Sequence, residues 1–144
     1  MLKAKRSYVV IVGCGRLGSF LANSLSREGY SVVVIDKSEE AFEALTAEYS
    51  GFRIEGNATE AAVLRQAKID KADIVIATTH DDNLNLMVAQ VAMEIFNIKK
   101  VIARVFDPKR ERIYKEIGID TVCPTIISGN AFLRTILNQE TLSE

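Results

Sequence analysis

A glycine-rich turn directly follows the first apolar run of the chain. The run Tyr8-Val9-Val10-Ile11-Val12 passes into Gly13-Cys14-Gly15-Arg16-Leu17-Gly18, where helical spacing of apolar residues begins. Three glycines at this spacing between a strand and a helix predict a backbone that approaches a phosphate group closely. Gly13 permits the tight turn, Gly15 leaves space for the phosphate, and Gly18 lets the helix pack against the sheet. The positive end of the helix dipole then faces the phosphate.

An acidic residue follows the second apolar run. Residues 31–35 are apolar except for the first, and Asp36 comes next. In a strand–turn–helix–strand unit, a carboxylate at this place accepts hydrogen bonds from both ribose hydroxyls. Its charge repels a 2′-phosphate, so we expect an adenine nucleotide or NAD(H) rather than NADP. A glycine motif alone is weak evidence, but this context makes it specific for an adenosine-containing ligand.

Six short runs rich in β-branched residues alternate with helical patterns. The predicted strands are Tyr8–Val12, Ser31–Ile35, Phe52–Ile54, Ile74–Ala77, Val101–Ala103 and Thr121–Val122. Between them, apolar residues recur at helical spacing, for example Phe42 with Leu45. The first, second and fourth runs are continuously apolar, which is typical of parallel strands covered on both faces. We therefore predict an α/β fold: a doubly wound parallel sheet of the Rossmann type, with strand order 3-2-1-4-5-6.

Capping residues predict where several helices begin. Asn57 and Glu60 form a box-like arrangement before a helix. Asp82 is expected to open the fourth helix, and Asp107-Pro108 supplies an N-cap followed by proline in the first turn. These starts agree with strand–helix alternation along the whole sheet.

Composition limits the classes of protein that the chain can belong to. Its 144 residues with 48% hydrophobic content suit one compact domain. Lys and Arg total 18 against 19 for Asp and Glu, so no bulk charge favours nucleic acid or an anionic membrane. No stretch approaches the roughly 18 consecutive apolar residues of a membrane span, so we expect any membrane role to depend on a partner. Cys14 and Cys123 are interpreted as free thiols in a reducing cytoplasm.

The end of the chain carries an apolar helical pattern. A helix is predicted from Ser128 to Leu142. The apolar residues of this region are Ile126, Ile127, Phe132, Leu133, Ile136 and Leu137. A terminal helix packed on its own sheet is one interpretation, but six apolar residues exceed what one sheet edge requires and favour a partner surface. We expect a tail at 1–6, a nucleotide-binding domain at 7–124, and a dimerisation or crossover helix at 125–144.

Several motifs together resemble the TrkA-type N-terminal domain, a family also called RCK or KTN, for regulator of potassium conductance. They are the glycine turn, Asp36, Gly56–Glu60, Ala77–Asn85, Ala103-Arg104 and Gly118–Pro124, and they cover nearly the whole chain. The resemblance implies a regulatory subunit, not an enzyme, that gates a potassium channel or transporter by binding AMP, ADP, ATP or NAD(H).

The same resemblance implies partners and a location. It implies a homo-oligomer, either a dimer or an octameric ring, or a ring shared with a second RCK-type chain. In the family, the segment after Pro124 crosses over to a neighbouring subunit. The resemblance also implies a cytoplasmic protein held at the inner face of the cell membrane by an integral-membrane potassium channel or transporter. No nucleic acid partner is expected, because the balanced charge of the chain does not favour one.

Two residues depart from the family pattern. Asn57 stands where the family usually has Asp; its carbonyl can accept from the adenine amino group and its NH2 can donate to a ring nitrogen. Thr125 stands where some relatives have an acidic residue associated with cation binding, so no metal is expected. The candidate nucleotide-binding residues are Gly13, Cys14, Gly15, Arg16, Leu17, Gly18, Asp36, Lys37, Asn57, Ala58, Thr78, Thr79 and Arg104.

Some of these candidates also have a structural explanation. Arg16 either pairs with a phosphate or is solvated, and Thr78 with Thr79 either line the cleft or simply end a strand. Arg104 either reaches a phosphate or a partner subunit, or forms an ion pair with a carboxylate such as Asp107. For Cys14, a small residue that fits the turn is favoured over a redox sensor.

The polar residues after the fourth strand could suggest catalysis. His80 resembles a general base, but we expect no substrate domain in a chain of this length, so a solvated or loop-capping histidine is favoured. Asp81 and Asp82 are interpreted as helix-capping carboxylates rather than metal ligands. No catalytic residue is therefore predicted. The alternative function is the NAD-binding half of a dehydrogenase that lacks its catalytic domain.

Overall fold

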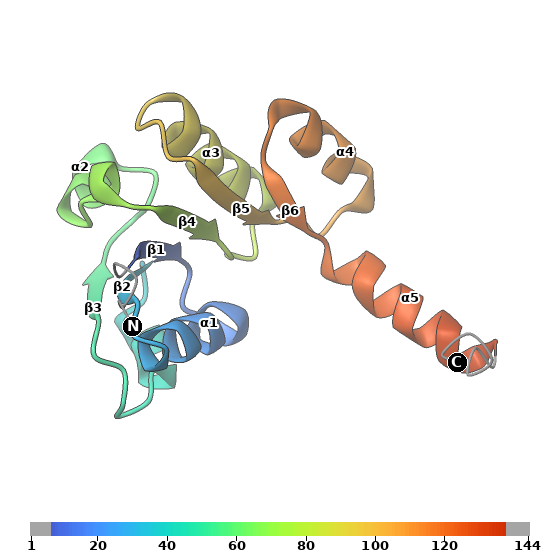
Figure 1. The fold of residues 1–144 in the computed structure, drawn as a ribbon, viewed down its shortest axis with the longest axis horizontal. Helices are drawn as coiled ribbons and strands as arrows, with labels where there is room; N and C mark the ends of the chain where they lie inside the picture. The colour runs from blue at the N-terminus through green and yellow to red at the C-terminus, as the bar shows by residue number, and fades with distance from the viewer. Residues whose placement is uncertain (1–6, 138–144) are drawn as a thin grey trace, which may run out of the picture.

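The computed structural model describes residues 7–137 and contains one six-stranded parallel sheet (Figure 1). The sheet order is β3-β2-β1-β4-β5-β6, which confirms the predicted Rossmann topology. The strands are β1 (Tyr8–Val12), β2 (Ser31–Asp36), β3 (Phe52–Glu55), β4 (Ile74–Ala77), β5 (Lys100–Arg104) and β6 (Asp120–Val122). The α-helices are α1 (Arg16–Arg27), α2 (Ala61–Gln66), α3 (Asp82–Glu94), α4 (Pro108–Ile117) and α5 (Pro124–Ile136). Two short 3₁₀ helices are η1 (Glu39–Ala44) and η2 (Ile69–Lys71).

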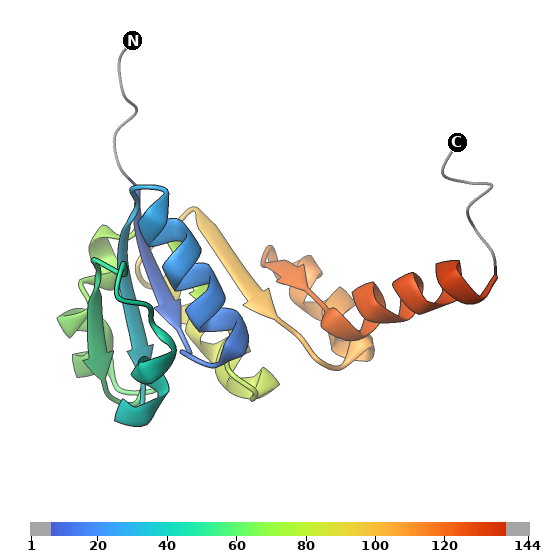
Figure 2. The ribbon, with the colours of Figure 1, turned by 90° about the horizontal axis from the view of Figure 1, so that it is seen from below.

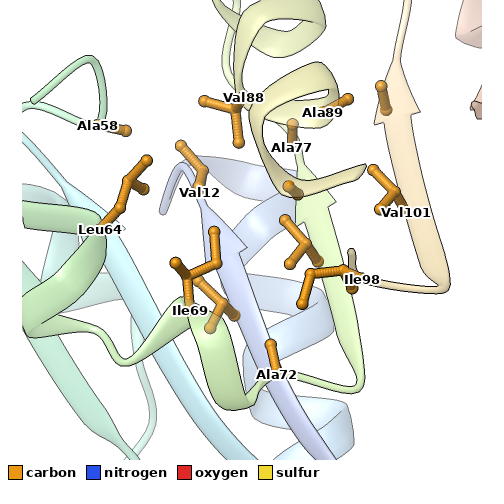
Figure 3. Packing of buried hydrophobic residues seen from close by; sticks show 14 of the residues in the cluster. Val12, Ala58, Leu64, Ile69, Ala72, Ala77, Val88, Ala89, Ile98 and Val101 are labelled. Carbon is orange, nitrogen blue, oxygen red and sulfur yellow. The ribbon is translucent and has the colours of Figure 1, made fainter. Parts of the chain in front are cut away.

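Strand β1 is the centre of the hydrophobic core because helices cover both of its faces. Val10 and Val12 belong to a cluster with residues of α2 and α3, while Val9 and Ile11 belong to a second cluster with Ala22 of α1. Figure 3 shows the first cluster between the sheet and α3. This two-sided burial explains why the run is continuously apolar.

The two faces of the sheet are covered unequally. The cluster on the α3 side extends from β2 to β5, whereas the cluster on the α1 side takes its strand residues from β1, β2 and β4. Ile102 of β5 pairs with Ile76 of β4 and so lies on the α1 side, but it is only half-buried. Val122 of β6 is 40% exposed. The β5–β6 half of this face is therefore partly open.

Helix α5 begins earlier than predicted. It starts at Pro124 instead of Ser128, because proline takes the first helical turn and Cys123 the N-cap. It is described to Ile136, and the predicted continuation at 138–142 lies outside the described residues. None of its side chains is buried. Figures 1 and 2 both show α5 projecting away from the sheet.

Two further local predictions need correction. The segment with Phe42 forms the 3₁₀ helix η1, which ends before Leu45, instead of an α-helix. The capping box is also wrong: Asn57 accepts hydrogen bonds from the backbone N–H and Oγ1 of Thr59, at 2.9 and 2.8 Å, and Glu60 takes the N-cap of α2 with no side-chain bond. An Asx turn therefore replaces the box.

Other predicted helix starts are confirmed. Helix α3 begins at Asp82, and α4 has Asp107 as its N-cap followed by Pro108, with the Asp107 carboxylate accepting from the Lys109 N–H at 3.0 Å. Across residues 7–137, no helix is both long and apolar enough to span a bilayer.

Candidate nucleotide-binding site

The three glycines of the β1–α1 turn have different surroundings. Gly13 has a φ of +107°, a conformation that other residues rarely adopt. A Cβ on Gly18 would lie 1.8 Å from the Gly13 carbonyl oxygen, so α1 packs directly on the turn. A Cβ on Gly15 would meet only Nε2 of His80, at 3.8 Å. The first and third glycines are therefore required by the backbone, whereas the second leaves open space before the N-terminus of α1.

Asp36 joins the end of β2 to this turn. Its Oδ2 accepts from the backbone N–H of Cys14 at 2.8 Å, and its Oδ1 accepts from the N–H of Ser38 at 2.9 Å. Each carboxylate oxygen has capacity for a second hydrogen bond. The carboxylate is thus fixed in place and can still accept from ribose hydroxyls.

A cleft of about 380 Å³ lies at the carboxyl ends of β1, β2 and β4. This is where ligands bind in doubly wound sheets, and the volume suits a small-molecule ligand. The predicted residues that line it are Gly13, Gly15, Asp36, Lys37, Asn57, Ala58, Thr78 and Thr79. Residues that the prediction did not include also line it: Val12, Ile35, Gly56, His80, Asp81 and Leu84. The predicted Cys14, Arg16, Leu17, Gly18 and Arg104 are not among its lining residues.

Cys14 contributes its main chain to the turn while its side chain belongs to the core. The side chain is buried in the cluster beneath α1. Burial, together with the nearby Asp36 carboxylate, raises the pKa of the Cys14 thiol to about 11. Because the thiolate is the reactive form, this residue is a poor redox sensor at neutral pH. The interpretation as a small residue that fits the turn is favoured.

Asn57 offers fewer groups to adenine than predicted. Its Oδ1 is engaged by two donors of Thr59, as described above. The carbonyl oxygen has two lone pairs, so both are used. The NH2 group remains as the donor for an adenine ring nitrogen.

Arg104 connects the carboxyl ends of two neighbouring strands. Its guanidinium donates to the carbonyl oxygens of Thr78 and Thr79, at 3.2 Å for the latter. It also lies over the Phe106 ring, 4.6 Å from the centroid. Burial lowers the pKa of Arg104, and the charge of Asp82 opposes that effect. Arg104 of β5 therefore binds carbonyl oxygens at the end of β4, in place of the ion pair with Asp107 that was the alternative interpretation.

Thr78 and Thr79 also have structural contacts. The Thr78 hydroxyl is buried and lies 3.1 Å from the Val12 carbonyl oxygen and 3.2 Å from that of Gly13, to either of which it can donate. Thr79 is bound through its N–H and its hydroxyl by Asn85, as described next. Both threonines therefore hold the wall of the cleft in place.

Asn85 is a site residue that the sequence interpretation did not single out. It is 0% exposed, and its Oδ1 accepts from the N–H and the hydroxyl of Thr79, at 2.9 and 2.7 Å. Its Nδ2 donates to the carbonyl oxygens of Thr79 and Arg104, at 2.9 and 3.0 Å. One amide thus connects α3, the β4–α3 loop and β5. The signal in the sequence was a polar residue between Leu84 and Leu86 on an apolar helix.

Replacing Asn85 with Leu should destabilise the domain by roughly 2–5 kcal/mol, because the N–H of Thr79 and the carbonyl of Arg104 lose their partner in the interior. Chemical denaturation would measure the loss. Gln90→Leu changes a half-buried amide on the same helix and should shift stability by no more than about 0.5 kcal/mol. Equal free energies of unfolding for the two variants would show that the hydrogen bonds of Asn85 do not stabilise the domain.

The two acidic residues after His80 have separate structural roles. Asp81 is the N-cap of α3 and accepts from the N–H groups of Asn83 and Leu84, which confirms its capping role. Asp82 instead accepts from the N–H groups of Phe106 and Asp107, at 2.8 and 3.1 Å. Asp82 therefore ties the start of α3 to the β5–α4 loop.

Comparison with known proteins identifies a matching family and several relatives. The model of the TrkA-N domain family matches residues 9–125. The Trk system potassium uptake protein TrkA of Streptomyces coelicolor is 38% identical over 130 residues. The match covers 90% of this chain and 58% of that protein, so the chain spans less than two thirds of its relative.

Solved structures of one channel protein, GsuK, share the fold. The GsuK RCK domain superposes with a TM-score of 0.79 at 25% identity, over 94% of this chain and 29% of that chain. GsuK bound to ADP gives 0.78 at 25%, over 92% and 34% of the two chains. The GsuK channel bound to NAD gives 0.81 at 24%, over 98% and 25%.

Proposed function

This chain belongs to the TrkA-N domain family, and from that premise we propose that it is the nucleotide-binding regulatory part of a potassium channel or transporter. Its ligand is an adenine nucleotide (AMP, ADP or ATP) or NAD(H). The alternative, half of a dehydrogenase, requires a catalytic group and a substrate site that nothing described above supplies.

The observation that carries the proposal is the glycine turn fixed to Asp36 at the edge of the cleft. The N–H of Cys14 is bound to the Asp36 carboxylate, so the phosphate-binding turn and the ribose-binding group are held at one mutual distance. Gly15 and Asp36 both line the cleft. All the proposed ligands share the adenosine 5′-phosphate half that such an arrangement recognises.

The relatives support the ligand class and the partner. A protein of similar fold, GsuK, has been solved with ADP, and the TrkA relative is a potassium uptake protein. A ligand regulates a transporter by binding two arrangements of the subunits with different affinity, so binding energy alone does the work. No catalytic residue is required for regulation of this kind.

Self-association through α5 completes the proposal. The side chains of Phe132 and Ile136 are each 69% exposed, and Ile126, Ile127, Leu133 and Leu137 are exposed as well. An exposed apolar surface of this extent marks an interaction site. We propose that α5 crosses to a second copy of the chain, so that nucleotide binding in paired domains changes the angle between them.

Asp36→Ala should weaken binding of ADP and NADH by about 1–3 kcal/mol, because the ribose hydroxyls lose a charged acceptor and the turn loses its anchor at Cys14. Calorimetric titration of both ligands measures the effect. Glu39→Ala, an exposed carboxylate on η1, serves as a matched control and should bind both normally. Unchanged affinity in Asp36→Ala would remove this residue from the site, and no binding by the wild type would overturn the proposed function.

A further inference from the structure

Three side chains form a stack at the carboxyl ends of β4 and β5. The guanidinium of Arg104 lies 4.6 Å from the centroid of the Phe106 ring. The Phe106 ring in turn stacks with the His80 ring: their centroids are 6.0 Å apart and the angle between their planes is 18°. Arg104 is itself anchored on the carbonyl oxygens of Thr78 and Thr79. The stack therefore fixes the plane of the imidazole from outside the cleft.

The other side of His80 faces the glycine turn. His80 lines the cleft together with Gly13 and Gly15, and its Nε2 lies 3.8 Å from the position that a Gly15 Cβ would take. Helix α1 begins at the next residue, Arg16, and a phosphate binds at such a helix start. The imidazole nitrogen thus borders the phosphate position from the opposite wall.

We propose that His80 in its protonated form donates a hydrogen bond to the ligand phosphate, so that nucleotide binding tightens as the pH falls from about 8 to about 6. This inference rests on the proposed function and adds pH as a second signal, which changes the affinity for the nucleotide. Imidazole is the side chain whose charge changes in this range, and an imidazolium binds phosphate more strongly than neutral imidazole does. Arg104 and Phe106 are positioning residues, because they act through the orientation of His80.

Charged groups of both signs border His80 from the surrounding elements. They are Asp81 and Asp82 at the start of α3, Asp107 and Arg110 around the start of α4, and Asp36 and Lys37, which line the same cleft. Arg104 lies on Phe106, the next ring in the stack, and Arg16 opens α1 one residue after Gly15. Since His80 is the only histidine in the chain, any histidine titration belongs to it.

The test uses NAD⁺, because its pyrophosphate keeps a constant charge across this range, whereas a terminal phosphate titrates near pH 6. Its Kd is measured at pH 6 and pH 8 at one ionic strength. We expect the wild type to bind about five- to tenfold more tightly at pH 6, the change produced by one coupled proton. His80→Gln should show no dependence on pH, and Phe106→Leu a reduced one. The single histidine ring signal in NMR should move toward its protonated position when NAD⁺ is added at pH 7.

The failures are distinguishable. Equal Kd values for the wild type at both pH values, or a full pH dependence in His80→Gln, would overturn the role of His80 and leave nucleotide binding intact. If neither NAD⁺ nor ADP binds at any pH, both the inference and the proposed function are wrong. An unmoved histidine signal in protein saturated with NAD⁺ would also overturn the contact.

Discussion

Gly15→Val should abolish nucleotide binding, with affinity for ADP and NAD⁺ falling by more than about 100-fold, or roughly 3 kcal/mol. The side chain would enter the open space between the turn and His80, where the phosphate is expected. The fold should survive, because Gly15 has a φ of −77° in the extended region that valine also adopts. Loss of an N-cap glycine costs about 1 kcal/mol of stability.

Gly18→Ala is the contrasting variant for this experiment. Its Cβ would lie 1.8 Å from the Gly13 carbonyl oxygen, so the smaller substitution should damage folding more, by about 3 kcal/mol or more. Calorimetry with both ligands and chemical denaturation of both variants give the two readouts. If Gly15→Val binds normally, the glycine turn is only structural. If Gly18→Ala is as stable as the wild type, helix α1 does not depend on close packing at this point.

The double variant Phe132→Asp/Ile136→Asp should convert a dimer into a monomer. Burying even four of the apolar side chains of α5 contributes on the order of 6 kcal/mol before the entropy cost of association. Two carboxylates placed in that interface would be buried without partners. Sedimentation at micromolar concentration should show a dimer for the wild type and a monomer for the variant, while ADP affinity changes little.

A matched control changes exposed apolar residues on other elements. Phe52→Asp/Ile95→Asp alters side chains that are 74% and 66% exposed on β3 and at the end of α3. This variant should remain a dimer. A wild type that sediments as a monomer at every accessible concentration would exclude α5 as a dimer interface, and with it the simplest route from nucleotide binding to a change between subunits.

The strands and the glycine turn were predictable because their signals are local, and the strand order then followed from the rules for right-handed crossovers in doubly wound sheets. Strands β1, β2 and β4 contain continuous apolar runs, and the glycine turn and Asp36 directly follow the first two of these runs. The start of α5 was also encoded locally, in Pro124, but this residue was interpreted as a boundary instead of the first turn of a helix. The Asx turn at Asn57 was mistaken for a capping box, since both use the same residue types at similar spacing.

The remaining site features depend on contacts between distant segments. The orientation of His80 depends on Phe106, which belongs to the loop after the next strand, and no periodicity connects them. Asn85 was overlooked because helical spacing was judged from apolar residues, whereas this residue is buried through its hydrogen bonds. Arg104 was recognised as a candidate, but its contacts with β4 carbonyl groups follow from strand pairing.

The exposure of α5 has a consequence for how this part of the chain folds. It has 13 residues and no buried side chain, which is the length at which an isolated helix in water is only marginally stable. If α5 pairs with a second copy as proposed, its helicity depends on that copy, and the ordering of α5 and the meeting of two chains form a single equilibrium. The helical fraction of α5 would then depend on protein concentration as well as on temperature. The domain core around the buried strand β1 is held by contacts within one chain, so its stability would not depend on concentration in this way.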